Sequence, residues 1–175
     1  MKNLYFPRRI AWLAVVFGAA ALSGCVFAPG HGGHGSHEGL EGTWVTRVSA
    51  GPGQSGPFLS IATYTPTGQV LEENNSPAVR SLGHGDWRRT GRNSFQRTIT
   101  SFNFAGPARD YTGATRVVSD ITLEPGGDAY NQVSRFDVYN PAGQLVTSGQ
   151  NTGHANRCGT GSRIPVCLGI EPAPK

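Results

Sequence analysis

Three evenly spaced histidines are the residues of this chain whose type and spacing most directly suggest chemistry. His31, His34 and His37 recur at every third position within the glycine-rich stretch 26–39. Imidazole side chains are suitable ligands for zinc, copper or nickel ions. A flexible glycine-rich chain has no neighbouring groups that would orient the rings. We therefore interpret the stretch as a solvated tether and predict no metal site.

A second cluster of charged side chains surrounds Trp87. His84, Asp86, Arg88 and Arg89 lie close to it in the sequence and are suitable for acid–base chemistry at the rim of a binding site. If this stretch is a strand, Arg88 points to the opposite face from Trp87 and Arg89. The simpler interpretation is a strand with Trp87 packed inward and its charged neighbours in solvent. The same two interpretations apply to three further polar residues: Asp110, Tyr111 and Asp120.

The beginning of the chain has the order of features found in an export signal. Lys2, Arg8 and Arg9 give a positive start, and an apolar run of 13 residues follows from Ile10 to Leu22. A helix that spans the hydrocarbon core of a membrane needs about 20 apolar residues. The run is shorter than that and has the length of the helical core of a signal peptide, so we exclude residues 1–24 from the fold.

The residues that end this segment resemble the lipobox of bacterial lipoproteins: Leu22-Ser23-Gly24-Cys25. In that family the cysteine thiol is diacylglycerated, the signal peptide is removed before it, and the new amino group is usually acylated with a chain such as palmitate. The resemblance implies a lipid anchor on Cys25, because two or three acyl chains on one residue hold a protein stably at a membrane. Val26 follows in place of Asp, which in Gram-negative relatives favours the outer membrane, on its periplasmic face. The alternative is an ordinary secretory signal with a chance cysteine.

The remaining cysteines can be interpreted once Cys25 is assigned to lipid. Cys158 and Cys167 are then the two that are left, and an exported protein lies in an oxidising compartment, where disulfides persist. We therefore predict a disulfide between Cys158 and Cys167.

The net charge of +4 does not indicate a nucleic-acid-binding protein. Of the 15 Lys and Arg residues, Lys2, Arg8 and Arg9 belong to the signal segment, and the 12 that follow nearly balance the 11 Asp and Glu residues. A nucleic-acid-binding surface needs clustered basic side chains, and none is visible. The roughly 150 residues after Cys25 are suitable for one domain with its own core.

Turn sequences divide this domain into short segments. Thr65-Pro66-Thr67-Gly68 and Asn140-Pro141-Ala142-Gly143 have Pro second and Gly fourth, as type I turns prefer, and Glu124-Pro125-Gly126-Gly127 suits type II. The runs between the turns are rich in Thr, Val, Ile, Phe and Tyr, and they predict eight strands. These strands cover residues 42–50, 58–64, 69–74, 85–90, 94–105, 114–124, 128–139 and 144–155.

The connections between these strands are too short for parallel pairing, which needs crossovers of a dozen or more residues. The last four strands are long for a sandwich and suit a barrel, in which tilted strands run the full height. A closed barrel also leaves no free strand edge. We therefore predict an all-β fold, an eight-stranded antiparallel up-and-down β-barrel over residues 40–157. A tether (25–39) precedes it, and an irregular tail (158–175) follows it.

Gly42-Thr43-Trp44 at the start of the first strand resembles the Gly-x-Trp motif of lipocalins and other calycins. In those barrels the Trp closes one end, and an Arg or Lys at the end of the last strand packs over its ring. The resemblance therefore implies that Trp44 and Arg157 close the barrel, a contact worth about 0.5–2 kcal/mol. The stretch from Gly83 to Gly91, followed by Phe95, is similar to uncharacterised bacterial lipocalin-like proteins. Unlike ordinary lipocalins, the chain has no recognisable helix after the barrel.

Strand parity indicates what the barrel encloses. In the strand at 114–124, Val117, Ser119 and Ile121 share one face, so the interior mixes apolar and small polar side chains. Such a lining is typical of a ligand cavity, although an eight-stranded barrel can also fill its own interior. In the strand at 94–105 the apolar residues change parity, which predicts a β-bulge or two partly buried faces. Size and parity give five candidates for the ligand-binding wall: Tyr64, Phe102, Phe104, Tyr130 and Phe136.

Three functions are compatible with this barrel, and fold alone does not choose among them. We favour a lipid-anchored envelope protein that binds or shuttles a small apolar or amphipathic molecule. The second hypothesis is a barrel enzyme of the isomerase, cyclase or decarboxylase type, and the third is a structural or inhibitory protein with a filled barrel. No nucleophile–base pair with a local sequence signature is visible, so we predict no catalytic residues and no cofactor.

Overall fold

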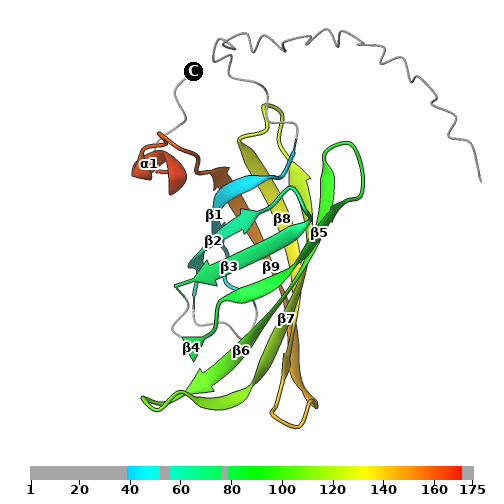
Figure 1. Ribbon diagram of the computed structural model, residues 1–175, viewed down its shortest axis with the longest axis vertical. Coiled ribbons are helices and arrows are strands. Elements are labelled where there is room, and N and C mark those ends of the chain that lie inside the picture. Colours follow the sequence, from blue (N-terminus) through cyan, green and yellow to red (C-terminus); the bar gives the residue numbers. More distant parts are fainter. Residues whose placement is uncertain (1–38, 52–55, 76–78, 171–175) are drawn as a thin grey trace, which may run out of the picture. The chain divides into compact units, whose positions relative to one another are not determined.

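The computed structural model describes residues 39–51, 56–75 and 79–170. The signal segment, Cys25 and the three tether histidines lie outside the described residues. In the described part the chain forms nine strands and one short helix (Figure 1). They are β1 (Gly42–Val48), β2 (Phe58–Tyr64), β3 (Gln69–Asn74), β4 (Val79–Arg80), β5 (Gly83–Arg89), β6 (Ser94–Ala105), β7 (Asp110–Leu123), β8 (Ala129–Tyr139), β9 (Leu145–Arg157) and α1 (Ile164–Cys167).

The strands close into a barrel in which neighbours in space are almost always neighbours in sequence. β1, β2, β3, β5, β6, β7, β8 and β9 pair in that order, each pair antiparallel, and β9 pairs with β1 to complete the ring. The two-residue strand β4 adds a short pairing to β6 outside this ring. The prediction of an all-β, eight-stranded antiparallel up-and-down barrel is confirmed.

Most strand boundaries agree with the prediction, and the differences have local causes. β5 begins two residues earlier than predicted and β7 four residues earlier, so that Gly83 and Gly113 belong to strands. Gly113 has φ of +129°, and a side chain there would overlap the Tyr139 carbonyl of β8. Glycine inside a strand commonly marks such a close backbone approach. The missed strand β4 is too short to produce an alternating pattern.

The two ends of the barrel differ in strand length and connections. The turns β2–β3, β5–β6 and β7–β8 lie at one end, together with the start of β1 and the end of β9. We call this the Trp44 end, after the residue of β1 described below. At the opposite end the hairpins β6–β7 and β8–β9 extend beyond the shorter strands (Figure 1). These long strands have 12, 14, 11 and 13 residues, against 6 or 7 in β1, β2, β3 and β5.

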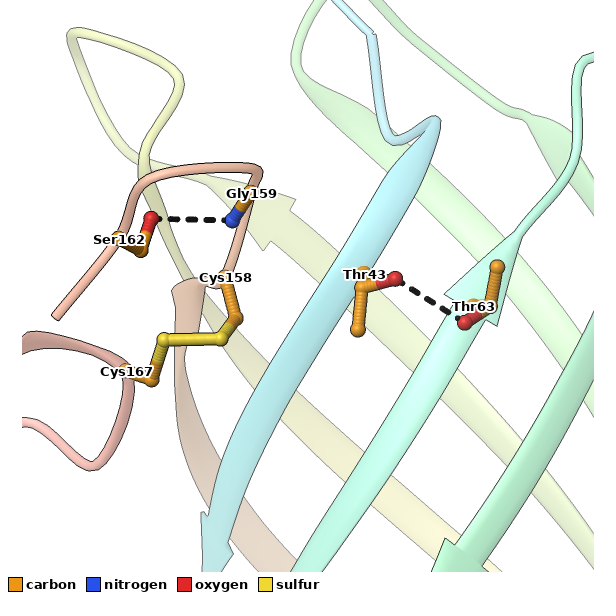
Figure 2. Close-up of a disulfide and its surroundings, with 6 residues drawn as sticks. All are labelled: Thr43, Thr63, Cys158, Gly159, Ser162 and Cys167. Carbon is orange, nitrogen blue, oxygen red and sulfur yellow. Dashed lines mark hydrogen bonds between the residues drawn. A yellow bond between two sulfur atoms is a disulfide. The ribbon is translucent and has the colours of Figure 1, made fainter. Parts of the chain in front are cut away.

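The tail that follows β9 is fixed to the barrel by the predicted disulfide. Cys158 and Cys167 are bonded, with a Cα–Cα distance of 5.0 Å, and the Cys158 N–H donates to the Thr43 carbonyl of β1. Figure 2 shows the loop that they close, in which the Gly159 N–H donates to Ser162 Oγ at 3.0 Å. The tail was predicted to be irregular but contains α1, which has a proline in its first turn. Among the described residues no helix combines the length and apolar character needed to cross a membrane.

The main hydrophobic core lies inside the barrel. Residues from seven strands contribute to it because side chains of a strand alternate between the interior and solvent. Its members are Leu40, Trp44, Ala62, Tyr64, Val70, Phe95, Ile99, Ile121, Leu123, Tyr130 and Ala155, with Trp87 packed against them.

Candidate functional site

The Trp44 end of the barrel is closed by a fully buried indole. The Trp44 side chain is 0% exposed and its Nε1–H donates to the Leu40 carbonyl at 2.8 Å. The guanidinium of Arg157, which lies opposite Trp44 in the β1–β9 pairing, sits 4.2 Å from the ring centroid. The structure thus brings together the two residues that the lipocalin motif implies.

Arg157 also joins three separate segments of backbone. Its Nη2 donates to the carbonyls of Gly39 and Gly127 at 2.8 Å, and Nη1 donates to the carbonyl of Glu41. Burial lowers the pKa of this guanidinium, and the nearby Asp128 and Glu41 carboxylates oppose the shift. The side chain therefore holds the start of β1 and the β7–β8 turn against the end of the last strand.

Polar side chains form a connected layer in the middle of the barrel. The Tyr130 hydroxyl lies 3.0 Å from Thr46 Oγ1 and 3.4 Å from the Tyr64 hydroxyl. The three residues are at most 1% exposed. Burial raises the pKa of Tyr64 well above its ordinary value. This phenol is therefore neutral at physiological pH and can both donate and accept a hydrogen bond.

The same layer contains a buried ion pair. Arg97 is 3% exposed, and its Nη2 lies 2.7 Å from Oε2 of Glu72. Arg97 also donates to the Tyr64 hydroxyl at 2.8 Å and to Ser119 Oγ at 3.2 Å. Burial lowers the pKa of Arg97, but Glu72 and the two tyrosines outweigh that effect and raise it above its ordinary value. The guanidinium therefore stays charged inside the barrel.

Two glycines belong to β5, the strand between the two that carry this ion pair. Arg97 belongs to β6 and Glu72 to β3, and β5 lies between these strands. Gly83 and Gly85 occupy two successive inward positions of β5. A Cβ at Gly83 would lie 2.6 Å from Cγ2 of Ile99, and one at Gly85 would overlap the Thr98 carbonyl. Neither position therefore has room for a side chain as the barrel stands.

The interior away from the Trp44 end is lined mainly by hydroxyl and amide groups. We call it the polar half and define it by Ser60, Arg80, Gln132, Ser134 and Phe136. Ser60, Gln132 and Ser134 are at most 3% exposed. Ser134 Oγ lies 2.9 Å from Ser119 Oγ. In contrast, Ser60 Oγ and Gln132 Oε1 are buried and have no hydrogen-bond partner among the described residues.

The five predicted wall residues lie in different environments. Tyr64 and Tyr130 are inside the barrel, but they belong to the packed core and the hydroxyl layer. Phe136 faces the interior of the polar half and is half-buried. Its ring fills the space that a side chain at Gly149 would occupy. Of the five, Phe136 is therefore the aromatic candidate that lies in the polar half.

Phe102 and Phe104 lie on the hairpin β6–β7 instead. Phe102 is 54% exposed and stacks edge-to-face with Tyr111, and Phe104 contacts Tyr111 and the Arg109 guanidinium. The predicted β-bulge exists, but it falls between Asn103 and Phe104. It comes too late in the strand to turn Phe102 inward.

The charged cluster around Trp87 has the simpler of its two arrangements. Trp87 packs against Tyr64 and Phe95, and its Nε1–H donates to the Thr65 carbonyl. Arg88 points outward to Gln96, while His84 and Asp86 are exposed. Within the described ranges, no three His, Cys, Asp or Glu side chains are grouped as a metal site would require.

A groove of about 580 Å³ lies outside the barrel, between α1 and the outer faces of β1, β2 and β3. Apolar side chains and the disulfide form most of its walls. The apolar members are Val45, Leu59, Ile61, Ile164 and Leu168. The neighbouring hydroxyls of Thr43 and Thr63 bond across β1 and β2 at 3.1 Å (Figure 2).

Sequence reasoning missed the buried ion pair, although the sequence contains a signal for it. Arg97 shares its strand face with Phe95 and Ile99, and Glu72 is two residues from Val70. Inward parity for a charged residue indicates a buried charge, and buried charges are usually paired.

Comparison of the chain with protein-family models, with curated proteins and with solved structures gave no match.

Proposed function

We propose that this protein is an envelope lipoprotein whose barrel binds or carries a small amphipathic molecule. The lipobox-like residues before Cys25 support the lipid anchor. The Gly-x-Trp motif and the contact of Arg157 with Trp44 support a lipocalin-like barrel. Because Trp44 closes one end, the ligand enters from the opposite end.

The observation that carries the proposal is the pair of unpartnered polar atoms in the polar half. A buried donor or acceptor without a partner costs about 1–3 kcal/mol, so native proteins satisfy nearly all of them. Ser60 Oγ and Gln132 Oε1 both lie on the inner wall. A ligand with its own hydrogen-bonding group would satisfy them, while Phe136 offers an apolar surface. This combination favours an amphipathic ligand over a purely apolar one.

The binding experiment uses the exported chain carrying Cys25→Ser, which leaves the rest of the domain unchanged. We expect 1-dodecanol to bind with a dissociation constant in the micromolar range, or roughly −8 kcal/mol, by isothermal titration calorimetry. Gln132→Leu should weaken binding by about tenfold, since it removes one hydrogen bond to the ligand. Gln150→Leu, an exposed position of β9, is the matched control and should bind as the parent does. Failure of dodecanol and of every other apolar or amphipathic probe to bind contradicts the proposal.

The filled barrel is the second candidate, because the middle layer is densely packed. Tyr64, Tyr130 and Ser119 are at most 1% exposed and their hydroxyls take part in the network. In that case the barrel acts through its outer surface and loops. Absence of binding by any apolar or amphipathic probe would favour this candidate.

The lipid anchor has its own test. Mass spectrometry of the peptide that begins at Cys25 should find a diacylglyceryl group on the thiol. Cys25→Ser should leave the protein soluble or unprocessed. A variant that stays tightly membrane-bound contradicts the assignment.

A further inference from the structure

The interior contains a second, partly buried guanidinium whose charge the barrel does not balance. Arg80 lies opposite Asn103 in the β4–β6 pairing, and Asn103 bonds to the inward-facing Thr115. Directly opposite residues of an antiparallel pair point to the same side, so Arg80 faces inward. Its Nε is buried and has no hydrogen-bond partner in the described part of the chain.

Only one carboxylate compensates for the two arginines. Glu72 lies 2.7 Å from Arg97, which leaves the charge of Arg80 without an ion pair within 4 Å among the described residues. The other described carboxylates lie at outward positions of strands or in turns. They are those of Glu41, Glu73, Asp86, Asp110, Asp120, Glu124, Asp128 and Asp137.

Arg80 is only partly exposed to the solvent that would normally stabilise its charge. Burial lowers the pKa of Arg80, and the Glu72 carboxylate only partly opposes this shift. Ser60 lies diagonally from Glu72 across the β2–β3 pairing, and its unpartnered hydroxyl can donate a hydrogen bond. The polar half therefore contains an uncompensated positive charge, a free N–H donor and a nearby hydroxyl.

From this arrangement we infer that the polar half is a site for an anionic group, a carboxylate or phosphate, at the head of the amphipathic ligand. Arg80 is the main binding residue, and Ser60 is an additional donor. Guanidinium groups are well suited to both oxyanions because several N–H donors converge on them. The apolar part of the ligand then lies against Phe136. This inference rests on the proposed function and specifies the chemistry of its ligand.

The test compares ligands that share one alkyl chain and differ in head group. The probes are dodecanoate, dodecyl phosphate, 1-dodecanol and dodecyltrimethylammonium, each kept below its micelle concentration. They are titrated into the exported chain carrying Cys25→Ser at pH 7.5. We expect at least one of the two anions to bind about tenfold or more tightly than dodecanol. The cation should bind most weakly. The ratio between the two anions distinguishes a carboxylate site from a phosphate site.

Variants at Arg80 assign the effect to this residue. Arg80→Gln should lower the affinity for the anions to about that for dodecanol and so remove the preference among head groups. Arg80→Lys keeps the charge and should retain much of the preference. Arg88→Gln, which removes an outward-facing guanidinium on β5, is the matched control and should retain all of it. Circular dichroism confirms that each variant is folded.

The outcomes separate this inference from the proposed function. If dodecanol and the anions bind equally well, the anion site is wrong and the ligand-binding barrel stands. If the anions are preferred and Arg80→Gln does not change the preference, the assignment to Arg80 is wrong. If none of the four probes binds, both the anion site and the proposed function are contradicted.

Discussion

The Trp44 end and the polar half belong to one barrel, but they differ in whether their buried polar groups have hydrogen-bond partners. At the Trp44 end a fully buried indole donates to a backbone carbonyl and lies beneath a guanidinium with three carbonyl partners. In the polar half, Ser60 and Gln132 are equally buried but have polar atoms without partners. Phe136 is only half-buried.

This contrast separates stability from binding. Packed aromatic area and satisfied hydrogen bonds stabilise a fold, and both are concentrated at the Trp44 end. A binding surface must instead keep donors, acceptors and apolar area available for its ligand. The polar half has these properties. The following variants test this contrast, in order of decreasing expected change in stability.

The same aromatic truncation should have different consequences in the two regions. Trp44→Ala should lower the free energy of unfolding by about 3–5 kcal/mol, because it leaves a large cavity and an unpaired Leu40 carbonyl. Phe136→Ala should lower it by less, about 1–2 kcal/mol, because this ring is only partly buried. Guanidinium chloride unfolding followed by far-ultraviolet circular dichroism measures both. Equal losses would mean that the two regions do not differ as described.

The buried ion pair marks the boundary between the two regions. Arg97→Met leaves the Glu72 carboxylate buried without its partner and should cost about 3–5 kcal/mol of folding stability. The double variant Arg97→Met/Glu72→Leu removes both charges and should recover most of that loss. Urea unfolding of the two variants measures both changes in folding stability. A single variant that loses less than about 1 kcal/mol would indicate that solvent reaches Glu72.

The disulfide fastens the tail to the outside of the barrel beside β1. Replacing both cysteines, as in Cys158→Ala/Cys167→Ala, should lower the free energy of unfolding by about 2.5–3 kcal/mol for a closed loop of about ten residues. Reducing the parent protein with dithiothreitol should produce the same loss. Reductant should have no effect on the double variant, and a loss in that variant would have another cause.

Alkaline pH should weaken the middle layer through Tyr64. Its pKa in the folded protein is raised above the ordinary value of 10.0, so below about pH 10 the phenol is neutral in both folded and unfolded states. Above that value the unfolded chain loses the proton first, and stability falls as pH rises. Urea midpoints measured between pH 8 and pH 11 should therefore decline. Tyr64→Phe should flatten the decline, whereas Tyr111→Phe, at a half-exposed position, should leave it unchanged.

The smallest effect is expected in the polar half. Gln132→Leu replaces a buried amide that has an unpartnered oxygen with an apolar side chain of similar size. It should leave stability unchanged or raise it by up to about 1 kcal/mol, while it weakens ligand binding. Gln150→Leu should stay within about 0.5 kcal/mol of the parent. A clear loss of stability in Gln132→Leu would mean that this amide is part of the structural core.

The sequence was sufficient to predict the barrel because eight segments alternate between turn residues and β-rich runs. Parity also placed Tyr64 and Tyr130 inside, and the resemblance to the Gly-x-Trp motif implied the position of Trp44. Phe102 was placed on the wrong face because parity alone does not locate a β-bulge within a strand. β4 was missed because two residues show no period.

The features of the polar half were harder to predict. Charged residues in strands are usually assigned to solvent, so Glu72, Arg80 and Arg97 were not considered for the interior. The ion pair joins two strands, β3 and β6, that are separated by β5. Which polar atoms lack partners depends on side-chain geometry that no sequence pattern contains.

The closure of the ring by β1 and β9 also determines when the barrel can form. Arg157 Nη2 reaches the Gly39 carbonyl from a position 118 residues further along the chain. During synthesis one edge of β1 therefore stays unpaired until β9 has been synthesised. Contacts between such distant residues slow folding, and an exposed strand edge invites aggregation. A chain truncated before β9 would lack the partner of β1 and the guanidinium over Trp44. The ring therefore closes only in a chain that includes β9, and a chain that ends before β9 cannot form the barrel.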